Sequence, residues 1–500
     1  MLSLLTFLPL LGAVILYLIP RPAAWRWIAV GTSGAVLAVG ILLAALFNWQ
    51  QGTLQFVERA SWIPPLGSSY HLAVDGLSLP LILLSALLTF LALLYAWKQE
   101  RFPREYFVLY LVMETGLIGF FSTMDLLLFY VFFEIALVPM YFIIGIWGHE
   151  EKRKEAALKF FLYTRVGSLA VLLSILGLYL GVNPHTFDLP AIIAAHPYAG
   201  TGLGASLILL GFLVGFGIKL PVIPLHSWLP DAHTEAPTEG SVILAGLLLK
   251  LGGYGLLRLA LPTVPGAFSA WALPIIVLAV ISAIYGAAVA MAQTDLKRLI
   301  AFTSINHMGY VLLGIAVAAA LSANPADRIT AASGASYQLL AHGLVTSALF
   351  FLVGILADRT GTREIPRLSG IWAVLPLYGS ILAFSMFASL GLPALAHFAA
   401  EVQILLGTLG AYRWAAFGML FGILLTTALF LWTLQRVLLG TPATEWMKLP
   451  QLTRRELATL LPLLVLIVLL GIFPGPLVTV ITAALHGGPL SPASSVTIGG

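Results

Sequence analysis

The chain of 500 residues contains no cysteine and few charged residues. Without cysteine it can form neither a disulfide nor a thiolate-bound metal or iron–sulfur centre. Charged residues make up 9% of the chain, against about 25% in an average soluble domain, whereas 60% of its residues are hydrophobic. So few charges cannot cover the surface of a soluble protein of this size. Soluble enzymes, disordered chains and nucleic-acid-binding proteins are therefore excluded, and an integral membrane protein is indicated.

Long apolar segments, by contrast, fill the chain. A helix that crosses a bilayer needs about 20 mostly apolar residues. The apolar residues do not alternate with polar ones, as a lipid-facing barrel would require. The sequence therefore predicts an all-α fold, a polytopic membrane helical bundle of about 14 transmembrane helices. The predicted helices 1 to 14 cover residues 2–20, 27–47, 76–97, 106–123, 125–147, 156–181, 203–226, 240–260, 270–292, 298–321, 334–357, 371–408, 412–439 and 456–483.

The distribution of basic residues predicts the orientation of the bundle. If the N-terminus lies outside, the inner loops carry 18 of the 25 lysines and arginines. Cytoplasmic loops are enriched in basic residues. We therefore expect a multi-pass membrane protein with both termini on the outer side. The outer loops would carry only Arg59, Arg258, Arg328 and Arg413.

Two predicted helices are interrupted by proline, helix 7 at Pro221 and Pro224 and helix 12 at Pro393. Proline removes a backbone donor, and the freed carbonyls are tolerated in a membrane only where protein or water meets them. Because the breaks are five helices apart, we expect two inverted five-helix repeats around an ion pathway. The predicted domains are residues 1–105 (helices 1–3), 106–260 (first repeat, helices 4–8), 270–440 (second repeat, helices 9–13) and 441–500 (helix 14 and a tail).

Four ionisable residues inside the predicted helices are candidates for proton translocation: Glu134, Lys219, Lys250 and Glu401. A charge at this depth costs several kcal/mol at least, and by default it marks an ion path. A lysine in apolar surroundings keeps its proton beside a carboxylate and gives it up when the carboxylate moves away. A Glu134–Lys219 pair would thus act as a switch, with Lys250 as relay and Glu401 as exit acid. The alternative is a set of static ion pairs that hold helices together.

Histidine can pass protons near neutral pH, and three histidines are weaker candidates. His307 in helix 10 and His342 in helix 11 could bridge Lys250 and Glu401, or simply join two helices by a hydrogen bond. His226, with His233, lies beside the break in helix 7 and could line proton uptake or cap the turn. We expect most of the remaining histidines to be structural: His71, His149, His185, His196, His397 and His486.

Two further buried charges, Glu114 and Arg165, lie on neighbouring helices 4 and 6, and we expect them to form an ion pair with each other. Asp125 should begin helix 5, where a negative charge suits the helix dipole. No metal, nucleotide or haem motif is present, and no two histidines lie four residues apart inside a helix. The sequence therefore predicts no cofactor and no metal in this chain, and any redox chemistry belongs to another subunit.

Several segments resemble the antiporter-like membrane subunits of NADH–quinone oxidoreductase, respiratory complex I. They include Phe-Phe-Glu134-Ile-Ala-Leu-Val-Pro, Gly-Ile-Lys219-Leu-Pro-Val-Ile-Pro-Leu-His-Ser-Trp-Leu-Pro-Asp-Ala-His, Leu-Leu-Leu-Lys250-Leu-Gly-Gly-Tyr-Gly and Ser-Ile-Asn-His307-Met-Gly. The resemblance covers about residues 75–440. Within the family the chain most resembles the M branch. Its charged residue on helix 12 is Glu401, whereas the L and N branches both carry a lysine at this place.

This resemblance implies a translocase subunit that pumps protons without a redox centre. Glu134 and Lys219 match the family's coupling pair, Lys250 its central relay, Glu401 its terminal group, and His307 and His342 its connecting histidines. NADH, flavin, iron–sulfur clusters and quinone are expected in partner subunits. The expected partners are the homologous L and N subunits, other membrane-arm subunits and the lipid bilayer, and no nucleic acid.

The chain departs from the family pattern in two places. The helix 12 break reads Gly-Leu-Pro393-Ala-Leu-Ala-His397-Phe-Ala-Ala-Glu401, where the family usually has a Gly-Thr turn and a glycine before the acid. Arg165 stands where an uncharged residue is expected, and Glu114 also looks additional. Two other functions stay open: a subunit of a multisubunit cation/proton antiporter or membrane-bound hydrogenase, and a scaffold that transports nothing.

Overall fold

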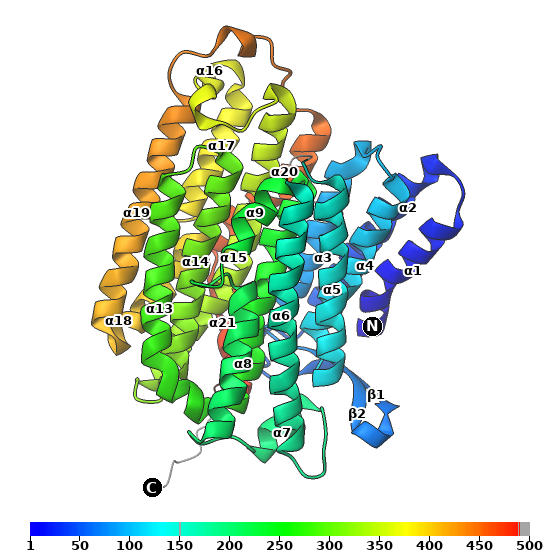
Figure 1. The fold of residues 1–500 in the computed structure, drawn as a ribbon, viewed down its shortest axis with the longest axis vertical. Coiled ribbons are helices and arrows are strands. Elements are labelled where there is room, and N and C mark those ends of the chain that lie inside the picture. Colours follow the sequence, from blue (N-terminus) through cyan, green and yellow to red (C-terminus); the bar gives the residue numbers. More distant parts are fainter. Residues whose placement is uncertain (150–151, 489, 491–500) are drawn as a thin grey trace.

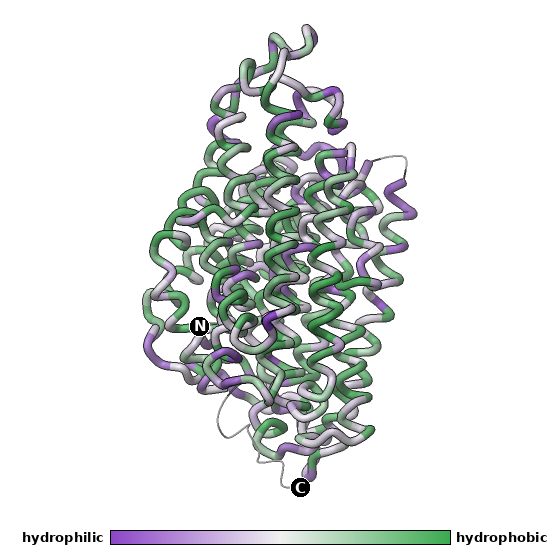
Figure 2. The backbone as a smooth tube through the Cα atoms, turned by 90° about the vertical axis from the view of Figure 1, so that its left-hand side faces the viewer, coloured by the Kyte–Doolittle hydropathy of each residue, from purple (hydrophilic) through white to green (hydrophobic). Residues whose placement is uncertain are grey.

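The computed structural model describes residues 1–149, 152–488 and 490. Most helices run along the long axis of the molecule (Figure 1), and hydrophobic residues dominate their length (Figure 2). Within the described residues, 11 helices are long and apolar enough to cross a membrane, and four shorter apolar helices accompany them. Each of the 14 predicted windows falls on such a helix or on a broken pair of helices. The prediction of an all-α membrane bundle is thus confirmed.

The N-terminal part contains an element that the sequence did not predict, a two-stranded antiparallel sheet. Its strands have mixed hydropathy, so a search for long apolar windows passes over them. The elements are α1 (Leu2–Leu18), α2 (Pro22–Leu46), β1 (Gln55–Ile63), the 3₁₀ turn η1 (Pro64–Leu66), β2 (Ser68–Val74), α3 (Leu79–Tyr95) and η2 (Ala96–Lys98).

This β-hairpin joins both described ends of the chain to the same side of the bundle. Glu58 of β1 accepts hydrogen bonds from the N-terminal ammonium and from the backbone N–H of Ser3. Burial alone would raise the pKa of the Glu58 carboxyl, but these hydrogen bonds outweigh it and lower the pKa to about 2. At the other end of the chain, Gly487 packs against Gly52, just before β1. Asp125 accepts hydrogen bonds from Ser68 and Ser69 at the start of β2.

The first half of the bundle follows. Asp125 begins α5 as expected, since its carboxylate accepts hydrogen bonds from the first backbone N–H groups of that helix. The elements are α4 (Pro103–Ser122), α5 (Leu126–Trp147), α6 (Arg153–Leu180), α7 (Leu189–Ala195), α8 (Leu203–Lys219) and α9 (Trp228–Glu235). One continuous helix then comprises α10 (Thr238–Ile243), the π-helical segment η3 (Leu244–Leu248), α11 (Leu249–Gly255), the π-helical segment η4 (Leu256–Ala260) and α12 (Leu261–Thr263).

The second half and the C-terminal part also contain broken helices. The last predicted window is not one helix, because Pro474 separates α20 from α21. The elements are α13 (Pro265–Met291), α14 (Leu296–Ala319), α15 (Pro325–Thr360), η5 (Ile365–Arg367), α16 (Ile371–Val374), α17 (Pro376–Ser389), α18 (Ala396–Ala411), α19 (Arg413–Leu438), η6 (Thr444–Trp446), α20 (Arg454–Ile472) and α21 (Gly475–Gly487).

Three helices form the centre of the bundle. The most apolar windows of residues 238–263, α14 and α15 are 100% buried, whereas those of α2 and α20 are only 28% and 22% buried. A charged or polar side chain on a central helix must therefore find its partners inside the protein. The division into repeats at residues 106–260 and 270–440 stays a prediction.

Candidate functional site

The first broken helix places Lys219 at the last position of α8. Pro221 and Pro224 end this helix, and the chain resumes as α9. The carbonyl of Ile218, freed by the break, accepts a hydrogen bond from the indole N–H of Trp228 at 3.0 Å. The break is therefore satisfied by protein groups, as membrane burial demands.

Lys219 lies among aromatic rings. Its Nζ is 5.2 Å from the centre of the Phe133 ring and 5.6 Å from that of Phe160, and it has no hydrogen-bond partner among the described residues. Glu134, next to Phe133 on α5, pairs instead with Arg165 of α6 through one carboxylate oxygen, and its other oxygen is unpartnered within the described chain. The predicted contact between Glu134 and Lys219 is therefore not formed in this conformation.

The predicted ion pair between Glu114 and Arg165 is wrong. Glu114 is completely buried and accepts a hydrogen bond from the hydroxyl of Ser33 on α2 at 3.0 Å. Arg165 points to the outside of the bundle, with 45% of its side chain exposed. Position on neighbouring helices does not decide the pairing, because the Ser33 hydroxyl holds Glu114 and Glu134 holds Arg165.

Lys250 lies between the two π-helical segments of the central helix. Single-turn π segments inside α-helices are frequent at functional sites. The Lys250 side chain is completely buried, and its Nζ donates a hydrogen bond to the carbonyl of Ala245 at 2.5 Å. It also lies 2.7 Å from Nδ1 of His342 on α15. Lys250 and His342 thus form a direct polar contact between two central helices.

Three histidine rings continue from this contact. The centre of the His307 ring lies 5.6 Å from that of His342 and 4.6 Å from that of His397. All three side chains are buried. The prediction that His307 and His342 lie between Lys250 and Glu401 is consistent with this arrangement. His397 belongs to the group of six histidines of which most are expected to be structural, yet it lies beside the other two rings.

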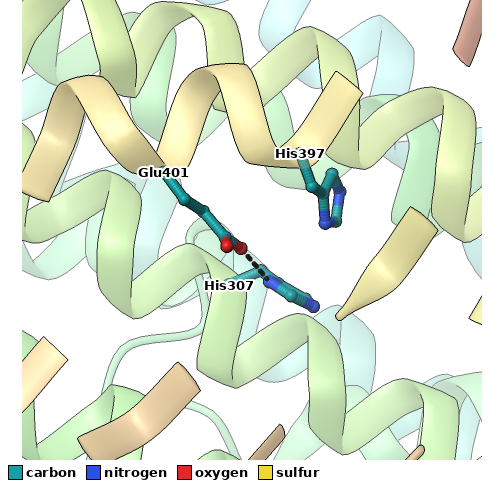
Figure 3. Close-up of side chains that lie close together, drawn as sticks. All are labelled: His307, His397 and Glu401. Carbon is teal, nitrogen blue, oxygen red and sulfur yellow. Dashed lines mark ion pairs between the residues drawn. The ribbon is translucent and has the colours of Figure 1, made fainter. Parts of the chain in front are cut away.

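The second broken helix carries Glu401 toward the same histidines (Figure 3). A carboxylate oxygen of Glu401 lies 3.5 Å from Nδ1 of His307. Gly391 in the break has φ +80, and a Cβ there would lie 2.5 Å from Oε2 of Glu401. Only glycine combines this left-handed conformation with room for the carboxylate.

Two histidines near the first break are not part of this central group. His226 lies in the loop between α8 and α9, half-buried, with its ring 5.2 Å from that of Tyr285. His233 on α9 is buried and stacks on Phe350 at 4.6 Å. No polar contact links either ring to Lys219 within the part of the chain that the structure describes.

Two basic residues assigned to loops lie inside the protein instead. Arg258 is buried in the central helix and pairs with Asp75, which precedes α3. Lys297, in the first turn of α14, is buried and donates a hydrogen bond to the carbonyl of Ala236. Both residues lie at the end of a predicted helix. The hydropathy of the sequence does not show which parts of the protein cover the end of a helix.

Comparisons with known proteins identify the family of the chain. The family model "NADH:quinone oxidoreductase/Mrp antiporter, TM" matches residues 123–426. NADH-quinone oxidoreductase subunit M of Rhodobacter capsulatus is 40% identical, and the match covers 95% of this chain and 93% of that protein. The chain belongs to the subunit M family of NADH–quinone oxidoreductase. Subunit M of Escherichia coli K12 is 39% identical, with 90% of each chain covered.

Solved structures show the same relationship. A chain of respiratory complex I from Thermus thermophilus superposes with a TM-score of 0.86 at 32% identity, covering 98% of this chain and 100% of that one. A chain of the Mrp complex from Dietzia has a TM-score of 0.82 at 21% identity, covering 99% of this chain and 98% of that one. The second match shows the shared fold alone. The sequence comparisons thus show the subunit M family, and the match to a complex I chain agrees with it.

Proposed function

We propose that this chain translocates protons as subunit M of NADH–quinone oxidoreductase, coupled to quinone reduction elsewhere in the complex. The observation that carries this proposal is the buried series of ionisable groups from Lys250 through His342, His307 and His397 to Glu401. Its members come from the central helix, α14, α15 and α18, and each is at most 5% exposed. Such a series is costly inside a membrane protein unless it has a function.

Proton transfer along this series follows from the chemistry of its members. Lys250 gives a proton to Nδ1 of His342, 2.7 Å away. An imidazole accepts a proton on one nitrogen and releases another from the second nitrogen, so His342 and His307 pass charge without moving far. The ring of His307 lies 5.6 Å from that of His342, a gap that one water or a small rotation bridges. Glu401 receives the proton from His307 and releases it outward.

The Glu134 region supplies the coupling step. In the present conformation Arg165 holds Glu134, and Lys219 has only aromatic neighbours. An unpaired ammonium in such surroundings is disfavoured, so Lys219 gives up its proton while Arg165 holds the carboxylate. When Glu134 turns to Lys219, the ammonium form is favoured again. A charge shift that follows quinone reduction would move Glu134 between these two partners and drive one proton outward per cycle.

The test uses the assembled complex in inverted membrane vesicles. Glu134→Ala or Lys219→Ala should largely abolish NADH-driven proton uptake while the complex still assembles. Glu155→Ala, in the cytoplasmic first turn of α6, is the matched control and should pump normally. A normal ratio of protons to electrons in either of the first two variants would refute the coupling role.

The partners follow from the same proposal. We expect NADH, flavin, iron–sulfur clusters and quinone to bind to other subunits. For the clusters this follows from the sequence, because the chain has no cysteine to ligate one. We place the homologous L and N subunits on either side of it. One supporting observation is the exposed Arg165 at mid-helix, since a charge that faces lipid at this depth is far costlier than one covered by a neighbouring protein. Co-purification in mild detergent tests this arrangement.

We also propose a location in the inner (plasma) membrane with both termini periplasmic. Two observations support this orientation: the predicted excess of basic residues in the inner loops, and the contacts of both described ends of the chain with the segment around β1. Reporter fusions that are active only outside the membrane should be active at both ends of the chain and inactive when inserted after Arg101.

A second candidate is a subunit of a cation/proton antiporter or a membrane-bound hydrogenase. The fold it shares with the Mrp complex chain favours this alternative. The set of co-purifying subunits separates the two functions: flavin and iron–sulfur subunits indicate the oxidoreductase. Sodium-dependent transport without any redox partner would indicate the antiporter instead.

A further inference from the structure

His307, His397 and Glu401 form a cluster with the donors of a metal site. One ligand atom from each residue lies within 4.8 Å of the other two, and all three side chains are buried. His397 and Glu401 are one helical turn apart on α18, and His307 approaches from α14 (Figure 3). The sequence contains no pair of histidines at this spacing in α18, because the second member of the turn is a glutamate.

Both imidazoles are held by one residue, Ser389, at the end of α17. The carbonyl of Ser389 accepts a hydrogen bond from Nδ1 of His397 at 3.2 Å, so Nδ1 carries the hydrogen and Nε2 keeps its lone pair. The hydroxyl of Ser389 lies 3.3 Å from Nε2 of His307. Nε2 of His397 and Nδ1 of His307 have no hydrogen-bond partner in the described part of the chain. Histidine ligands of metals are commonly oriented in this way through the second ring nitrogen.

We propose that His307, His397 and Glu401 bind a divalent transition-metal ion, Zn²⁺ above all, and that the bound ion blocks proton transfer. Two imidazoles and one carboxylate are a donor set that zinc accepts in sites with an open fourth position, at bond lengths of about 2.0–2.2 Å. Tetrahedral ligands are then about 3.3 Å apart, so the widest pair in the cluster needs to approach by up to about 1.5 Å. Magnesium and calcium prefer oxygen donors and are not expected to bind.

The broken helix gives the cluster room to contract. His397 lies in the first turn of α18, directly after the segment 390–395 that separates it from α17. A small shift of this turn changes the position of Nε2 without unfolding a long helix. Because the cluster is enclosed by protein, we expect zinc to enter slowly, and inhibition should develop with time.

The inhibitory effect rests on the proposed function, but binding of the ion does not. Zinc would bind to Nε2 of His397, Nδ1 of His307 and the carboxylate of Glu401, in place of any proton on these atoms. These are the atoms that would accept and release protons between Lys250 and the outside. The ion would also add positive charge near Lys250 and so oppose the transfer of another proton into the cluster.

Binding is tested on the purified complex incubated with zinc alone at buffered free concentrations. His397→Gln removes one ligand, and His149→Gln in the exposed loop after α5 is the matched control. After gel filtration, the wild-type and control complexes should each retain about one zinc ion more than the His397→Gln complex. X-ray absorption should show two imidazole nitrogens on that additional ion. Equal zinc content and equal spectra in all three complexes would overturn the site.

Inhibition is measured as NADH-driven proton uptake relative to each variant's own zinc-free rate. We expect the zinc concentration for half-inhibition to rise about tenfold or more in His397→Gln, since the loss of an outer-sphere partner alone costs about 10–100-fold in affinity at metal sites. Glu401→Gln is the second variant and should also lose the additional zinc ion in the binding experiment. If zinc binds as expected and leaves pumping unchanged, the metal site stands and the proton path through Glu401 fails.

Discussion

Two regions of the molecule contain buried charges beside a broken helix. The first surrounds Glu134 and Lys219, and the second runs from Lys250 to Glu401. Their charged groups have different kinds of partner. Lys219 has aromatic neighbours and no polar partner, and Glu134 pairs with an exposed arginine. Lys250 instead touches His342, and further imidazoles lead on to Glu401. The first region can change partners, whereas the second can pass a proton from group to group.

On the proposed function, this difference gives the two regions separate roles. A carboxylate with one bound and one free oxygen can respond to a change in local field, but it offers no onward acceptor. A row of histidines conducts in either direction and has no intrinsic gate. Pumping needs both a gate and a conductor, and the proposed function assigns the gate to the first region and the conductor to the second. The following variants break one region while leaving the other intact.

The largest effect should come from Lys250→Met. Methionine fills similar space with a flexible apolar chain, so the helix still packs, but the first donor of the conducting series is lost. We expect NADH-driven proton uptake to fall about tenfold or more, because the remaining histidines receive no proton from the inside. The measurement is the initial rate of proton uptake into inverted vesicles that contain equal amounts of complex.

Lys448→Met is the matched control for this substitution. Lys448 is exposed, between η6 and α20, and should be replaceable without loss of pumping. If Lys250→Met assembles normally and pumps at the control rate, the second region does not conduct protons. If assembly fails only in Lys250→Met, the residue is structural and the scaffold alternative gains support.

Arg165→Gln should produce an intermediate effect and test the first region. Without the guanidinium, Glu134 has Lys219 as its remaining basic partner, so the gate stays in one position. We expect proton uptake to fall about three- to fivefold, and Arg165→Lys to restore most of it. Arg165→Gln should cause no further loss in a Glu134→Gln background, because both substitutions disable the same gate. Additive losses in the double variant would show that Arg165 acts elsewhere, for instance on a partner subunit.

Gly391→Ala should have a smaller effect that is confined to the second region. The added Cβ would approach Oε2 of Glu401 to 2.5 Å and displace the carboxylate from His307. Gly440→Ala is the control, because Gly440 also has a positive φ (+94) but nothing lies within 4 Å of its Cβ position. Both variants pay about 1–2 kcal/mol for the left-handed conformation. Only Gly391→Ala should slow proton uptake, by about threefold. Equal rates in both variants would mean that proton transfer continues when the Glu401 carboxylate is displaced from His307.

The fold and much of this site could be predicted from the sequence, because a charge or a proline is conspicuous in an apolar chain. Lys219, Lys250 and Glu401 were found in this way, as were both broken helices. The contacts between these side chains were predicted less well, since the sequence does not show which charged groups face each other. Glu114 pairs with a serine, and His397, judged by its place after a break, lies against His307. The β-hairpin was missed because its strands contain no long apolar run.

The smallest effect should come from His226→Gln, which tests whether proton uptake begins at the loop between α8 and α9. The His226 ring packs on Tyr285 and has no polar contact with Lys219 among the described residues. Water can therefore replace it beside the break, and we expect proton uptake to stay within about twofold of the wild type. His185→Gln, in the loop before α7, gives the background level for replacing a loop histidine. A loss as large as that of Lys250→Met would make His226 an obligatory proton donor and would give the first region a conducting role of its own.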